Sequence, residues 1–245
     1  MFELPAWAMP EAARTTAAPK AEMVHETLRR AILFRAVAPG EQLLEQTLAT
    51  QLGCSQGTVR EALLRLAGDG LVERRGYRGT FVTETTLAEA AEMVRVRLSI
   101  ERTVARRLAV DGLGNGPGRR SVEAVLADMD EAQRARDLDR NSELDRAFHV
   151  ALARAAGMGL LCPVLRRCAL HMHRFTMGGL EVPREFFQHA GIGAEHRALL
   201  DALLAAEPEA AAALIEAHIE EVLSRWAPSL LAAAAPTPAS AVAPA

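Results

Sequence analysis

Four ionisable residues with metal-ligand chemistry lie in the second half of the chain, at positions where an amphipathic helix should be apolar. Asp145 and His149 are four residues apart and therefore share one helix face. His196 and His218 each lie within a leucine-rich stripe of a later predicted helix. The spacing predicts that three histidines and one aspartate point inward from three different helices.

A shared cation is the simplest partner for these four groups, because burying them without one is costly. An isolated inward histidine is more often a hydrogen-bonded core residue, but four convergent groups favour a divalent metal. Imidazole nitrogens with one carboxylate suit Zn, Ni, Mn or Fe, and spacing does not choose among these metals. The same donor set also occurs in metal-dependent hydrolases and isomerases, although no general base is evident in this chain.

A second group of residues has the chemistry of DNA recognition. Ser55, Gln56, Gly57 and Thr58 occupy the start of a predicted helix, where free N–H groups and short polar side chains suit phosphate contacts. Arg60 follows them and can reach a phosphate or a guanine edge. The pattern indicates a helix that reads a DNA groove.

The elements around this helix follow the order of a winged helix-turn-helix. A first helix ends at residues 38–40, a second at Gly53, and the third at residues 68–70. Two short alternating stretches then flank the glycine-rich turn at residues 76–79, which is typical of a β-hairpin. In such a fold the third helix enters the major groove and the hairpin reaches the backbone or the minor groove.

The rest of the chain predicts an antiparallel helical bundle. A capping box at Thr86 and Glu89 opens a long helix that runs to Asp111. Further helices are expected at residues 119–137, 141–156, 160–177, 185–206 and 208–227. The predicted fold class is therefore mainly α, an N-terminal winged helix-turn-helix domain followed by an all-α antiparallel bundle. The expected divisions are a disordered tail at 1–19, the winged helix-turn-helix DNA-binding domain at 20–84, the all-helical bundle at 85–229, and a disordered Ala/Pro-rich tail at 230–245.

Composition excludes several other classes of protein. Of the 245 residues 50% are hydrophobic but only 4% aromatic, and the dominance of Ala and Leu argues against a β-sandwich or barrel. Residues 20–83 hold nine Lys or Arg against seven Asp or Glu, whereas the net charge of the chain is −3, so a mildly basic head suits a polyanionic partner. With no apolar run near the ~20 residues needed to span a bilayer and no leader pattern, we expect a cytoplasmic protein without membrane contact. The three cysteines form no C-x-x-C pair.

The run PGEQLLEQTLATQLGCSQGTVREALLRLAGDGLVERRGYRGTFV, residues 39–82, resembles the DNA-binding domain of the GntR family. Gln46 and Gln56 stand where many members carry Arg, which predicts a salt slope flatter by up to about two units. The resemblance implies DNA contacts from Gln46, Ser55, Gln56, Gly57, Thr58, Arg60, Arg78 and Gly79.

The runs ELDRAFHVALARAAG and EHRALLDALLAAEPEAAAALIEAH resemble the FCD domain of the FadR-type subfamily, in its six-helix, metal-binding variant. The resemblance implies that a divalent metal is held by Asp145, His149, His196 and His218. VRVRLSIERTVARRLA resembles the first helix of that domain, which implies that Arg97 faces the effector pocket, although an ion pair with Glu101 is the alternative. Met158 stands at a position where members of this family usually have Asn. The roles of Arg166, Arg167, His171 and His173 stay open.

Together these features predict a regulator rather than an enzyme. We expect a ligand-responsive transcription regulator, acting as a repressor and binding a palindromic double-stranded DNA operator as a homodimer. Its expected effector is a small organic acid or sugar acid whose carboxylate meets the metal and Arg97. The alternatives are a metal-dependent hydrolase or isomerase, and a structural nucleic-acid-binding protein without ligand control.

Overall fold

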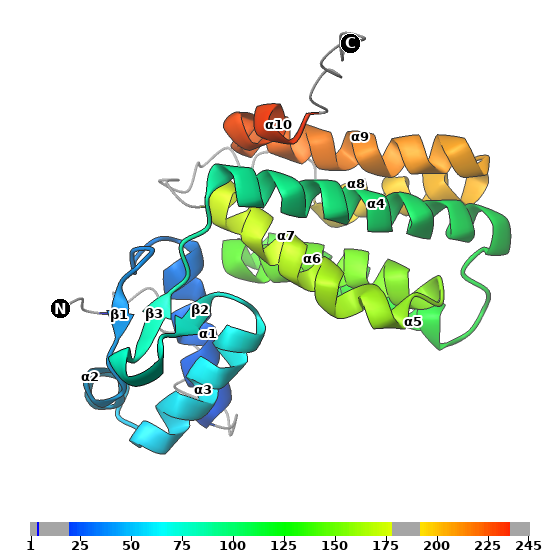
Figure 1. The fold of residues 1–245 in the computed structure, drawn as a ribbon. Helices are drawn as coiled ribbons and strands as arrows, with labels where there is room; N and C mark the ends of the chain where they lie inside the picture. Colours follow the sequence, from blue (N-terminus) through cyan, green and yellow to red (C-terminus); the bar gives the residue numbers. More distant parts are fainter. Residues whose placement is uncertain (1–3, 5–19, 178–191, 236–245) are drawn as a thin grey trace, which may run out of the picture.

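The computed structural model describes residue 4, residues 20–177 and residues 192–235. It has two parts, a winged head and a helical bundle, joined at one side (Figure 1). The head contains α1 (Lys20–Leu33), β1 (Gln42–Leu43), α2 (Glu45–Gln51), α3 (Gln56–Gly68), β2 (Val72–Arg74), the 3₁₀ turn η3 (Gly76–Arg78) and β3 (Thr80–Val82).

Local chemistry fixes the third helix of the head and the wing beside it. The Ser55 hydroxyl caps α3 by accepting a hydrogen bond of 3.1 Å from the Thr58 N–H. Strands β2 and β3 pair antiparallel with Val72 opposite Val82. The two-residue strand β1 pairs with the other edge of β3, so the sheet order is β1-β3-β2. The predicted hairpin is therefore part of a three-stranded sheet, and β1 is too short to leave a periodic pattern.

The first helix of the bundle, α4 (Leu87–Asp111), begins with the capping box that the sequence predicts. The Thr86 hydroxyl accepts from the Glu89 N–H, and the Glu89 carboxylate accepts from the Thr86 N–H. None of the described helices is both long and apolar enough to cross a bilayer. The bundle contains α4 (Leu87–Asp111), α5 (Pro117–Ala135), α6 (Leu138–Ala155), the turn η4 (Gly159–Leu161), α7 (Cys162–Met177), α8 (Ile192–Ala205), α9 (Pro208–Trp226) and α10 (Pro228–Ala234).

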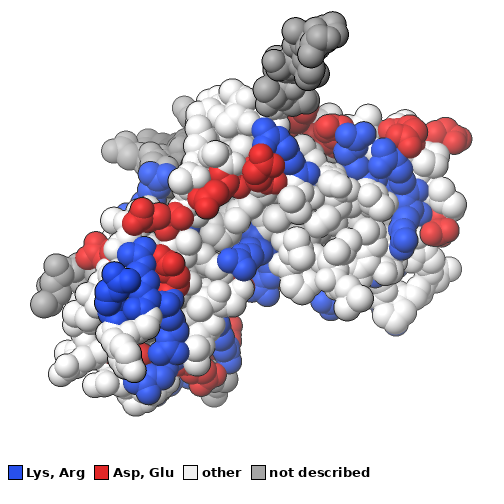
Figure 2. All heavy atoms as spheres, viewed as in Figure 1, with Lys and Arg blue, Asp and Glu red and all other residues white. Residues whose placement is uncertain are grey.

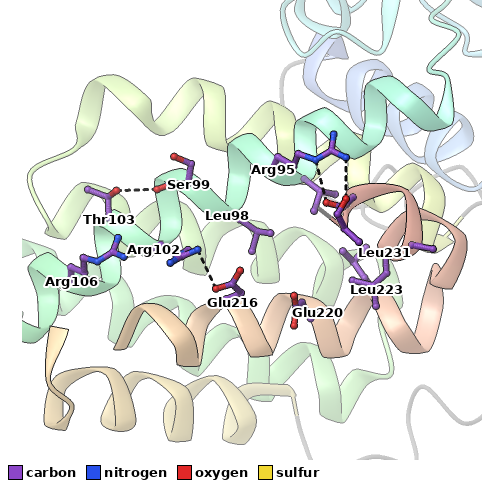
Figure 3. A pocket seen from close by; sticks show the side chains of 14 residues that line it. Arg95, Leu98, Ser99, Arg102, Thr103, Arg106, Glu216, Glu220, Leu223 and Leu231 are labelled. Atoms are coloured by element: carbon purple, nitrogen blue, oxygen red, sulfur yellow. Dashed lines mark hydrogen bonds and ion pairs between the residues drawn. The ribbon is translucent and has the colours of Figure 1, made fainter. Parts of the chain in front are cut away.

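The fold class predicted from the sequence is confirmed, with one correction at the C-terminal side. A helix, α10, stands where the prediction has a disordered tail from residue 230 onward. Pro228 occupies the first turn of α10, alanine favours helix, and Leu230 is fully buried. The Arg95 guanidinium of α4 donates to the carbonyl oxygens of Ala233 at 2.7 Å and Ala234 at 3.2 Å, which holds the end of α10 beside α4. Figure 3 shows Arg95 reaching from α4 toward α10.

Two other sequence predictions fall largely outside the described residues. These are the tail at 1–19, of which only residue 4 is described, and residues 236–245 of the other tail. The predicted helix at 185–206 is described from Ile192 onward.

The head and the bundle share packing and ion pairs at their junction. Leu170 of α7 is buried within the hydrophobic core of the head. The buried Arg29 of α1 pairs with Asp139 at 3.2 Å and with Glu143 at 2.5 Å, both on α6. The loop between β3 and α4 is held by α7, because Arg174 donates to the Thr83 carbonyl oxygen at 2.7 Å. Helix α7 therefore contacts both the head and its connection to the bundle.

His25 makes the stability of the head dependent on pH. Its ring is buried and lies 3.1 Å from Asp69 and 3.0 Å from Glu26. Although burial opposes it, the hydrogen bonds to these two carboxylates raise the pKa of His25 to about 9. Because the folded pKa exceeds the unfolded value, this stabilisation is complete below about pH 6.5 and is lost as the pH rises through 9.

We therefore predict that His25→Gln flattens the decline of the melting temperature between pH 6.5 and pH 9.5. The melting temperature of the wild type should exceed that of the variant by at least about 2–4 °C more at pH 6.5 than at pH 9.5. A loss of about 1 kcal/mol of stability lowers the melting temperature of a chain of this size by that amount. Differential scanning calorimetry measures it. Parallel curves for the two proteins across the whole pH range would contradict the role assigned to His25.

Candidate metal centre and nucleic-acid interface

The four residues predicted to bind metal come together inside the bundle. Asp145 and His149 lie on α6, His196 on α8 and His218 on α9. One potential ligand atom from each lies within 4.8 Å of those of all the others. The imidazole centroids of His196 and His218 are 5.0 Å apart, and those of His149 and His218 are 5.5 Å apart. Helices separated by up to 73 positions in sequence thus present one compact set of donors.

Neighbouring groups orient two of the imidazoles. The His149 Nδ1 donates to the Glu101 carboxylate, while its Nε2 is buried and has no hydrogen-bond partner among the described residues. The His196 Nδ1 donates to the Ile192 carbonyl oxygen at 2.8 Å, which turns its Nε2 toward Asp145 Oδ1 at 3.2 Å. A hydrogen bond at one ring nitrogen that leaves the other to face a common centre is the usual arrangement around a bound metal.

The charge states of the cluster also suit a cation. Although burial opposes it, hydrogen bonds from His173 and His196 hold the pKa of Asp145 well below its usual value. Burial, with the neighbouring His149 and His196, lowers the pKa of His218 to about 3. The cluster therefore offers an ionised carboxylate and a His218 imidazole that stays neutral at pH 7. Although burial opposes it, the hydrogen bond to Asp145 raises the pKa of His196, so a bound cation would displace the proton on its Nε2. With the unpartnered His149 Nε2, this donor set of one oxygen and three nitrogens fits a divalent first-row metal.

Arg97, the predicted effector contact, is fully buried in an ion pair. Its Nε donates to Glu101 Oε1 at 2.6 Å, and the other oxygen of Glu101 accepts from His149. Although burial opposes it, Arg97 and His149 lower the pKa of Glu101 to about 2. This is the ion pair that the sequence left as the alternative. In the structure Arg97 acts through Glu101 on the orientation of His149, and its contact with an effector stays a prediction.

Helix α7 carries the residues whose roles the sequence left open. His173 Nε2 lies 3.3 Å from Asp145 Oδ2, and Arg146 Nη1 donates to His173 Nδ1 at 2.6 Å. His171 and Arg174 both contact the Thr85 hydroxyl in the connection between head and bundle. Of Arg166, Arg167, His171 and His173, it is therefore His173 that contacts a predicted metal ligand, Asp145. Periodicity alone did not identify it, because α7 is buried on several faces.

The predicted DNA-contacting residues are all exposed or partly exposed on the head. Gln46, Ser55, Gln56, Gly57, Arg60 and Arg78 are exposed, and Thr58 and Gly79 are partly exposed. Arg60 on α3 forms a pair of hydrogen bonds with Glu45 of α2, the shorter at 2.7 Å. Because the Arg60 side chain is still 57% exposed, this pair restrains the guanidinium without covering it.

Gly79 allows the turn of the wing, and a hydrogen bond from the Gln42 side chain holds it. Gly79 has φ +99°, which favours glycine, and the Gln42 amide donates to the Arg78 carbonyl oxygen at 2.7 Å. The ring of Tyr77 is fully exposed at the wing tip rather than packed against it. Basic side chains lie over the head in the space-filling view (Figure 2). The wing therefore presents Tyr77 and Arg78 outward beside α3.

Two family models match the chain and account for most of it. Residues 20–82 match "Bacterial regulatory proteins, gntR family", and residues 92–221 match the FCD domain. The chain belongs to the GntR family. Its fold and its GntR head followed by an FCD domain confirm the family predicted from the sequence.

Relatives and solved structures agree with this membership. The chain is 29% identical over 212 residues to an HTH-type transcriptional regulator from an unstable DNA locus of Streptomyces ambofaciens, covering 81% of each chain. It is 32% identical over 138 residues to the HTH-type transcriptional repressor RspR of Escherichia coli, covering 56% of this chain and 60% of RspR. The structure of E. coli McbR/YncC superposes with a TM-score of 0.60 at 25% identity, covering 85% of this chain and 99% of that one.

These GntR relatives are transcriptional regulators, not enzymes. The prediction of a DNA-binding regulator is thereby confirmed, and the hydrolase or isomerase alternative is wrong. The metal, the effector, the operator and the oligomeric state are not tested by these comparisons.

We predict that Arg60→Ala weakens operator binding by about 1–3 kcal/mol, roughly ten- to a hundredfold, because it removes a charged contact in the reading helix. Arg65→Ala is the matched control on the same helix, because Arg65 is turned toward Glu22 of α1 and pairs with it. Fluorescence anisotropy with an operator duplex measures both. Equal losses for the two variants, or no loss for Arg60→Ala, would refute this assignment.

We also predict that the double variant His196→Ala/His218→Ala is purified without the metal that the wild type retains. Two of four donors are then missing, which leaves too few ligands for tight binding. His171→Ala is the control, since its buried histidine contacts Thr85 and lies outside the cluster. Elemental analysis of all three proteins decides the matter. A full complement of metal in the double variant would exclude this centre.

Proposed function

We propose that this GntR-family chain is a metal-containing, ligand-responsive repressor that binds a palindromic operator as a homodimer. The observation that carries the proposal is the convergence of Asp145, His149, His196 and His218 within the same chain as a DNA-reading head. The name of the relative RspR, a transcriptional repressor, supports repression as the mode of action. Symmetric helix-turn-helix dimers bind two half-sites about one helical turn apart, which supports the palindrome.

The proposed effector is a small organic acid or sugar acid. A divalent ion held by Asp145, His149, His196 and His218 supplies a Lewis-acidic centre for a carboxylate or hydroxyl oxygen. Glu101 keeps the His149 Nδ1 occupied so that its Nε2 faces the centre. Arg97 and Glu101 neutralise each other within the bundle, and a direct contact between Arg97 and the effector is part of the proposal.

The proposed route from this site to the DNA runs through α7. His173 contacts Asp145 at one end of the route, and its neighbours His171 and Arg174 contact Thr83 and Thr85 in the connection to the head. A change at Asp145 that moves His173 therefore also displaces the helix that positions the head. Effector binding changes operator affinity only by as much as its affinities for the two arrangements differ.

The test is fluorescence anisotropy with a duplex from the upstream region of the protein's own gene and a scrambled duplex at two salt concentrations. We predict tight, salt-sensitive and sequence-selective binding that small hydroxy acids and dicarboxylic acids weaken. Because the acid acts at the metal centre, it should have no effect on the His196→Ala/His218→Ala variant, which still binds the duplex. Equal release of DNA from wild type and variant would contradict the proposed effector site.

A further inference from the structure

An open cleft of about 370 Å³ lies where the head meets the bundle, apart from the metal cluster. Residues from α1, α5, α6 and α7 line it. Its charged lining is strongly unbalanced, because it contains a single carboxylate, Glu143, and five arginines: Arg29, Arg140, Arg146, Arg154 and Arg166. Figure 2 shows basic side chains on the visible face near this junction.

Three of the five arginines have carboxylate partners. Arg29 pairs with Glu26, Asp139 and Glu143, Arg140 pairs with Asp128 and Glu143, and Arg166 lies 3.9 Å from Asp69. The positive charge of these three side chains is therefore largely balanced by the protein itself.

Arg146 and Arg154 differ from the other three. Among the described residues no carboxylate lies within ion-pair distance of either guanidinium. Arg146 is buried. Among the described residues its hydrogen-bond partner is the His173 ring at 2.6 Å, which is not an anion. A buried cation with no carboxylate in direct contact is costly, and an anionic ligand in contact with it lowers that cost.

Another buried donor, without a hydrogen-bond partner in the described part of the chain, belongs to Arg29, which also lines the cleft. The Nη1 of Arg29, a side chain only 3% exposed, is buried without a hydrogen-bond partner among the described residues. The cleft thus contains donors from the head and from the bundle that can bind one ligand jointly. Apart from Ser121, its remaining lining is apolar: Val125, Leu144, Ala147, Val150, Ala151 and Leu170.

We propose that this cleft binds a small organic anion, with a phosphate or carboxylate group on an apolar body, at a site separate from the metal centre. Guanidinium groups bind both kinds of oxyanion through paired hydrogen bonds. The apolar body would lie on the surface between Arg146 and Arg154, where Ala147, Val150 and Ala151 follow one another along α6.

Such a ligand would join the two parts of the chain. It would contact Arg29 of the head and Arg146 of the bundle, and Arg146 in turn contacts His173 beside Asp145. Occupancy of the cleft would therefore fix the head against the bundle. This second ligand site goes beyond the proposed function and does not depend on it.

Isothermal titration calorimetry of the full chain with phenyl phosphate tests the proposal. The protein is first stripped of metal with a chelator, so that the anion cannot bind at a metal ion, and chloride keeps the ionic strength constant. We expect saturable binding of one phenyl phosphate per chain. Arg154→Gln and Arg146→Met should each weaken it at least tenfold, whereas His196→Ala/His218→Ala should leave it unchanged.

Arg134→Gln is the matched control, because this exposed arginine lies on the face of α5 opposite Val125 and should bind phenyl phosphate like the wild type. Thermal unfolding without ligand checks that each variant is folded, and Arg146→Met should melt no lower than the wild type. No saturable binding, or equal binding by wild type and both cleft variants, overturns the proposal. It is also overturned if phenyl phosphate fails to bind while Arg154→Gln weakens duplex binding, since the cleft then contacts DNA.

Discussion

The stability of the helical bundle depends on how it compensates the charges of the ionisable groups that it buries. One carboxylate, three imidazoles and the Arg97–Glu101 pair lie among leucine and alanine side chains, where an uncompensated charge is costly. Arg97 and Glu101 neutralise each other, and Glu101 binds the His149 Nδ1. What remains is an ionised Asp145 and imidazole nitrogens directed at one point. A single divalent cation would satisfy these groups together, and no hydrogen bond among the described residues satisfies the His149 Nε2.

The need to compensate the buried ionisable groups also explains why α7 lies between the cluster and the head. Its residues face three different environments within little more than one turn: Leu170 packs into the head, Arg174 binds the connection to the head, and His173 contacts Asp145. A helix is stiff along its axis, so a displacement at His173 cannot be confined to that residue. The proposed communication between the metal cluster and the head would therefore run through one shared helix that contacts both, rather than through a chain of remote contacts.

Sequence patterns predict much of this fold because helices leave clear periodicity and caps. The capping box at Thr86 and the capped start of α3 at Ser55 are local features, and both are present in the structure. The four cluster residues could be identified because each interrupts an apolar stripe. Strand β1 is too short for a pattern, and the composition of α10 resembles that of a tail. The cleft and the contact between His173 and Asp145 depend on how α1, α6 and α7 pack in space, which no local pattern encodes.

The central claim is that one metal ion compensates the buried Asp145, His149, His196 and His218. Anomalous X-ray scattering from a crystal of the purified protein, recorded on both sides of the absorption edge of the metal found by elemental analysis, tests it most directly. The account predicts one strong anomalous peak per chain, at about 2.0–2.2 Å from the ligand atoms of these four side chains. A map without a peak there, in which His196 and Asp145 simply share a hydrogen bond, would contradict it.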